Sequence, residues 1–198
     1  MSGTIGDNVA RASGVIASAA SADFVKIKET VVTAGTPASI DFVHGTGGVV
    51  IDSTYQTYCL IVKAVPSGAS VKGCIRLSDD TGSTFESSGY ITTAYRRYYS
   101  GGQGGGSSSS YLMYPEGGCD NTKASAQFSC TAWLGDMADS TTLTSCWGLA
   151  TQTDGASVQN NANFFAGNMA SVGNHDGIQF LFNSGNVQFA TATLYGLK

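Results

Sequence analysis

The sequence is short of charged residues. They make up 12% of its 198 residues, against roughly 25% in an average globular protein. Serine, threonine, asparagine, glutamine and glycine must therefore cover most of the surface. Neutral hydroxyl and amide groups are less costly to remove from water than ions, so this composition favours a surface that packs against neighbouring proteins.

The chain also lacks an excess of positive charge. Its net charge is −4, which argues against nucleic acid as a partner because few basic groups could neutralise phosphates. The basic pair Arg96-Arg97 is flanked by Tyr95, Tyr98 and Tyr99. Aromatic rings beside arginines can stack on single-stranded bases, but a strand with a tyrosine-rich face is the simpler interpretation.

Long apolar runs are missing as well. Stretches such as Cys59–Val62 are far too short to span a bilayer. The N-terminus has no basic segment followed by a long apolar run, as a signal peptide would. We therefore expect neither a signal peptide nor membrane insertion.

The cysteines and histidines do not form a metal-binding pattern. The 5 cysteines contain no CxxC pair, and the only histidines are His44 and His175, so a zinc site is not expected. The cysteine count is odd, and several cysteines lie within predicted strands. This favours free thiols in a protein made in the cytosol.

Patterns typical of catalysis are missing too. His175-Asp176 is the one neighbouring His–acid pair, and its glycine-flanked setting predicts a solvated turn. Oxygen donors for calcium occur in predicted loops, but without a fixed spacing; they are Asp79, Asp80, Glu86, Asp136 and Asp139. We predict no catalytic residue, no metal site and no cofactor, and hence a protein that is not an enzyme.

What the chain does contain is short alternating segments separated by glycine, asparagine and aspartate turns. About ten strands are expected, at residues 24–33, 38–43, 57–65, 70–78, 90–99, 123–134, 142–150, 161–170, 177–182 and 187–195. This pattern predicts an all-β, jelly-roll-like β-sandwich over residues 23–198. The Gly/Ser-rich stretch 100–110 is interpreted as a flexible surface loop within that domain, with an interdomain linker as the alternative.

The ends of the chain differ in character. Residues 1–22 are small and poor in large apolar groups, so we expect an extended arm that orders only against another surface; a floppy terminus is the alternative. At the other end, Gly177–Phe182 and Val187–Tyr195 flank Asn183–Asn186, which predicts a β-hairpin.

The segment Ser78–Phe85, SDDTGSTF, fits the Asp-box pattern S-x-D-x-G-x-T followed by an aromatic residue. In such a turn the aspartate caps local N–H groups and the glycine supplies a positive φ. A sialidase-like propeller would repeat the motif at blade spacing, and it occurs once here. We therefore interpret it as structural.

Together these motifs resemble the small β-sandwich proteins of tailed-bacteriophage virions. The resemblance rests on motif order: TIGDNVARASGVI, ASIDF, VVIDSTYQTYCLIV, LSDDTGSTFESSGY and IQFLFNSGNV…ATATLYGLK. It implies a homotrimer on the outside of a virion assembled in the host cytoplasm. Capsid decoration or cement is the preferred role, with the major capsid protein as a partner.

Two other hypotheses remain open at this stage. A tail-fibre or baseplate tip module would bind a host receptor or surface glycan through a tyrosine-rich surface; its candidate contacts are Tyr95, Arg96, Arg97, Tyr98, Tyr99, Tyr111 and Tyr114. A sialidase- or glycosidase-like enzyme would need the two facing carboxylates that no pattern here predicts.

Overall fold

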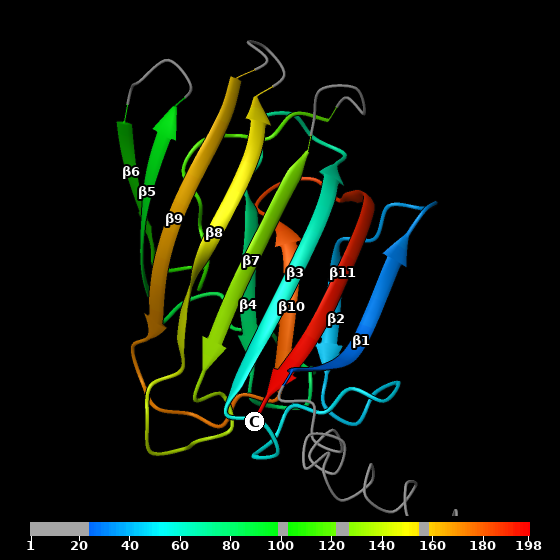
Figure 1. Cartoon of the computed structure of the whole chain (residues 1–198), viewed down its shortest axis with the longest axis vertical. Coiled ribbons are helices and arrows are strands. Elements are labelled where there is room, and N and C mark those ends of the chain that lie inside the picture. Colours follow the sequence, from blue (N-terminus) through cyan, green and yellow to red (C-terminus); the bar gives the residue numbers. More distant parts are fainter. Residues whose placement is uncertain (1–23, 99–102, 122–126, 155–158) are drawn as a thin grey trace, which may run out of the picture.

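The protein is a β-sandwich of two antiparallel sheets, as the alternation predicts (Figure 1). The computed structural model describes residues 24–98, 103–121, 127–154 and 159–198, and no helix occurs among them. The strands are β1 (Phe24–Val32), β2 (Ser39–Val43), β3 (Thr57–Pro66), β4 (Gly73–Ser78), β5 (Tyr90–Tyr98), β6 (Gln103–Ser108), β7 (Phe128–Gly135), β8 (Ser145–Asp154), β9 (Gln159–Met169), β10 (Gly177–Phe182) and β11 (Val187–Leu197).

The two sheets differ in size. The larger has eight strands in the order β1-β11-β3-β7-β8-β9-β5-β6, and the smaller has three in the order β2-β10-β4. In Figure 1 the large sheet lies in front and the small sheet behind it. Bridges from Met113 to Ile75 and from Cys119 to Val71 attach the chain after β6 to the small-sheet side of the sandwich.

The core lies between the facing sides of the sheets. Along β7, alternate residues from Phe128 to Leu134 point inward and are buried, as the period of two requires. The Phe128 ring contacts Phe180 and Phe182 of β10, with centroids 5.6 and 6.0 Å apart. These rings join the two layers.

The predicted C-terminal hairpin is wrong, although both of its strands exist. β10 pairs with β2 and β4, whereas β11 pairs with β1 and β3. The turn between them crosses from one sheet to the other. Its polar groups bond to a neighbouring turn: Asn183 exchanges hydrogen bonds with the Lys72 backbone, and Asn186 with Ser67. The apolar sides of β10 and β11 consequently face each other across the core.

The predicted Gly/Ser loop is partly a strand. β6 pairs with β5 from Arg97–Gln103 to Thr92–Ser108, and it is the eleventh strand, beyond the ten expected. Backbone hydrogen bonds from β5 stabilise a segment whose side chains would not predict a strand. The predicted arm, residues 1–22, lies outside the described residues.

The Asp-box segment forms the structural turn that was predicted. The Asp80 carboxylate accepts hydrogen bonds from the Thr84 amide at 2.9 Å and from the Ser78 hydroxyl at 2.8 Å. Gly82 has φ +76° and Thr81 has φ +59°. Asp176 accepts a hydrogen bond from the Thr81 amide, which ties the turn to the chain before β10.

Candidate functional site: the outer face of the large sheet

The outward side of the large sheet exposes large apolar side chains. Five of them on β5, β8 and β9 are 42–60% exposed, and we call them the outer patch: Ile91, Tyr95, Trp147, Leu149 and Phe164. Strand register places them together, since Phe164 pairs with both Leu149 and Tyr95. A monomer's largest apolar patch typically covers about 300–600 Å² and is often functional.

Aromatic rings extend this surface across neighbouring strands. Trp147 stacks on Trp133 with centroids 5.6 Å apart and an interplanar angle of 17°. Phe24, where the described chain begins, stacks on Tyr195 at 4.5 Å and lies 6.2 Å from Trp133. Cys59 occupies the register position between Tyr195 and Trp133 and is 1% exposed. The row therefore runs from β1 to β8.

The outer patch contains a hollow of about 400 Å³. Trp147 and Ile91 are among its lining residues, as are Ala166 and Gly167 of β9. Ala166 faces outward with a small side chain, so the surface is hollowed between larger side chains. The face thus combines protruding rings with a depression.

Charge is almost absent from the middle of this face. β7 and β9 contain no charged residue, and β8 has only Asp154, its last residue. The nearest outward charges are Lys63 on β3 and Arg97 on β5, and both are exposed. Covering the centre of the face would therefore require no ion to lose its water.

The residues predicted as receptor contacts do not gather in one place. Tyr95 and Arg97 point outward from β5, whereas Arg96 points to the opposite side, near Gly117. The side chain of Tyr98 and all of Tyr99 lie outside the description.

Tyr111 and Tyr114 belong to a separate arrangement near the small sheet. Their rings stack with centroids 5.5 Å apart. Arg76 lies over the Tyr111 ring and Lys72 over the Tyr114 ring. Each tyrosine thus contacts both another ring and a cation, and neither joins the outer patch.

Sequence reasoning missed most of the outer patch, although two signals were present. Phe164 and Phe165 are adjacent in a strand, and neighbouring side chains point to opposite faces. In β8, Cys146, Gly148 and Ala150 alternate with Trp147 and Leu149. Both patterns indicate a sheet whose two faces are apolar. Trp147 is 56% exposed, which excludes it from the core.

The prediction that His175 is a solvated turn residue is wrong. It is 2% exposed. Its Nδ1 lies 2.8 Å from the Thr144 hydroxyl oxygen, and its Nε2 lies 3.6 Å from Glu86 Oε1. Burial lowers the pKa of His175, although the negative charges of Asp79 and Asp176 act to raise it. Burial raises the pKa of Glu86.

This order of groups resembles a catalytic triad, but Thr144 is completely buried. Its hydroxyl also donates to the Asp136 carbonyl oxygen at 3.3 Å. A nucleophile must reach its substrate. We therefore interpret Thr144, His175 and Glu86 as a structural network that lies beneath the loops.

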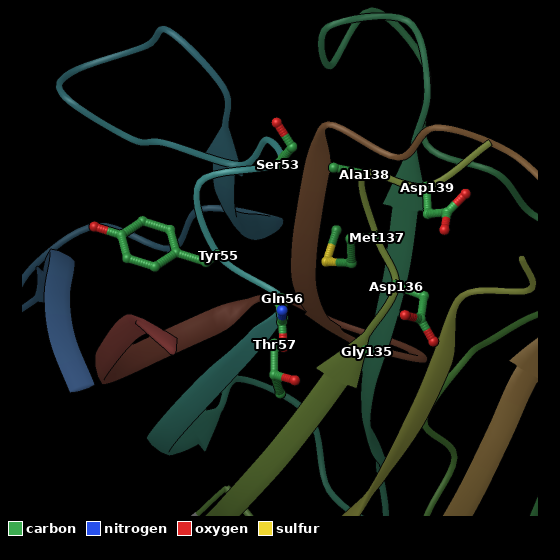
Figure 2. Close-up of a pocket in the computed structure, with 9 residues that line it drawn as sticks. All are labelled: Ser53, Tyr55, Gln56, Thr57, Gly135, Asp136, Met137, Ala138 and Asp139. Carbon is green, nitrogen blue, oxygen red and sulfur yellow. The ribbon is translucent and has the colours of Figure 1, made fainter. Parts of the chain in front are cut away.

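A second hollow, of about 410 Å³, lies at the end of the large sheet between residues 53–57 and 135–139 (Figure 2). Asp136 and Asp139 lie on the side away from Tyr55. Hydrogen bonds from Thr141 lower the pKa of Asp139. Within the described ranges, no three His, Cys, Asp or Glu side chains converge as metal ligands would. The volume of this second hollow is close to that of the hollow beside Trp147, so size does not favour it over the outer patch as the functional site.

Comparisons with known proteins do not assign the chain to a family. No protein-family model matches it, and no curated protein matches it. In the part of the chain that the structure describes, no helix has the length and apolarity needed to cross a membrane.

Proposed function

We propose that this protein is a structural component of the exterior of a tailed-phage virion, as a capsid decoration or cement protein. The observation that carries the proposal is the apolar outer face of a charge-poor β-sandwich. Exposed rings such as Trp147 and Phe164, at 56% and 60%, are stabilising when another protein covers them. Packing against protein is therefore the role that this surface fits.

The motif order that resembles virion β-sandwich proteins supports the same role. The partners we propose are copies of the chain in a closed oligomer and the major capsid protein. The protein would act without catalysis, because its task is to add buried contact area to a particle assembled in the host cytoplasm.

The test is to locate the protein on purified particles. Gold-labelled antibodies against the chain, viewed by negative-stain electron microscopy, should decorate the capsid surface at many regularly spaced positions. The matched control is a particle from which the gene has been deleted. If washed particles carried no label and no peptide of the chain by mass spectrometry, the proposal would be wrong.

A tail-fibre or baseplate tip that binds glycan is the second candidate, and the hollow beside Trp147 favours it. Exposed aromatic rings next to a depression can stack on the apolar face of a sugar ring. This role predicts label at the tail end only. It also predicts saturable binding of the full-length protein to host surface glycans, reduced by W147A.

A further inference from the structure

We propose that the outer patch packs against the outer patch of a second copy of this chain, related to the first by a two-fold axis, so that the chain forms a dimer and not the homotrimer that the motif resemblance implies. This inference rests on the proposed role as an assembly protein and specifies the partner of that surface. The area, shape and charge of the outer patch each support such a contact.

The exposed area of the outer patch approaches the area that each partner buries in a stable dimer. The five residues of the outer patch are 42–60% exposed, which corresponds to about 525 Å² of accessible surface if each residue has a full surface of roughly 200 Å². A standard protein–protein interface buries about 800 Å² per partner. The polar residues Thr93 and Asn168 of β5 and β9 line the hollow and would add to the buried area.

The shape is suited to self-complementary packing. A two-fold axis makes each residue i of one copy contact residue j of the other, and the reverse. The outer patch carries both parts of such a contact: Phe164 protrudes with 60% exposure, and the hollow beside Trp147 has Ala166 in its lining. Two copies can exchange these features across the two-fold axis.

Charge also permits a like-with-like contact. Two-fold packing places identical groups near one another, so charged residues at the centre would repel. The charged residues nearest to the centre, Lys63 and Arg97, belong to strands on either side of β7, β8 and β9. The neutral centre therefore carries no electrostatic cost of self-association.

Residues 1–23 are the competing occupant, since the described chain begins at Phe24 on this same face. Fully extended, they would reach about 75 Å. However, their large apolar residues are only Met1, Ile5, Val9, Val15 and Ile16. Five exposed side chains, three of them aromatic, are better covered by an equally apolar face.

The experiment is sedimentation velocity of the full-length chain, without particles, from about 1 to about 100 µM. The wild type should form a dimer. W147T removes a protruding ring, and A166R places a charge in the hollow from an exposed position. Each should raise the dissociation constant at least roughly tenfold, as expected for central interface residues.

The matched controls are V172T and A170R, which make similar changes at exposed positions outside the strands. They should leave the dimer unchanged, and far-UV circular dichroism should show that all four variants are folded. A monomeric wild type, a trimer, or a dimer that persists in both W147T and A166R would overturn the inference. Because no particle is present, these failures are separate from a failure to find the protein on virions.

Discussion

Phe128 and Gly73 allow a test of how the two sheets are joined. Phe128 is completely buried in β7 and contacts Phe180 and Phe182. Across the core, a Cβ added at Gly73 of β4 would overlap the Phe128 ring. The ring therefore occupies the space that a side chain at residue 73 would need, and the two positions should be strongly coupled.

The size of the coupling follows from the two single changes. F128A should cost about 4–5 kcal/mol, toward the upper end for Phe→Ala because the ring is fully buried and pairs with two others. G73V should cost about 1–3 kcal/mol by overpacking. In the double variant the overpacking disappears, and the valine carbons refill part of the cavity at about 0.8 kcal/mol per methylene. The double variant should thus be about 2–4 kcal/mol more stable than the sum predicts.

The assay is urea unfolding followed by far-UV circular dichroism, with all variants at one protein concentration because self-association shifts apparent stability. G105V is the control: a Cβ at this exposed glycine would lie 3.5 Å from the Ala94 carbonyl oxygen, an ordinary contact, so its effect should add to that of F128A. Additivity of G73V and F128A within about 0.5 kcal/mol would refute the proposed contact between the sheets.

Three further predictions concern protonation, thiols and the arm. Since burial lowers the pKa of His175 below its usual 6.5, the unfolded chain binds the proton more readily; His175 should favour folding above pH 6.5 and lose this effect as the pH falls below it. H175N should flatten that part of the stability–pH curve, and an unchanged slope in urea titrations would contradict the assignment. The five cysteines are free and buried, and burial raises the pKa of Cys59 to about 11, so a thiol reagent at pH 8 should react with the native protein only after denaturant is added; rapid reaction of the native protein would exclude this. Deleting residues 2–22 should leave a soluble β-sandwich that no longer attaches to particles, and full occupancy by the truncated protein in a co-sedimentation assay would rule out the arm's role.

Alternation was a reliable guide to where strands lie, because burial on one side of a strand follows a period of two. β7 shows this most clearly, with Phe128, Cys130, Ala132 and Leu134 all inward. The pairing of strands was not predictable in the same way. Asn183–Asn186 has the composition of a hairpin turn, but its hydrogen-bond partners, Lys72 and Ser67, lie more than a hundred residues away in sequence.

The candidate site was harder to predict than the fold. An exposed apolar face and a buried one have the same residue pattern, so the sequence pattern at Trp147 and Leu149 fits the core as well as the surface. His175 was assigned to solvent from its glycine-flanked turn, yet its partners Thr144 and Glu86 come from distant segments. In both cases the sequence pattern does not show which distant segments pack against the residue, and those contacts decide whether it is buried.

A cryo-electron microscopy reconstruction of purified particles would show directly whether this protein lies on the outside of the capsid. We expect density for this β-sandwich on the outside of the capsid, with the outer patch around Trp147 and Phe164 buried against a second copy of the chain. A reconstruction in which the sandwich is absent from the particle, or in which these two rings face solvent in every copy, would contradict this expectation.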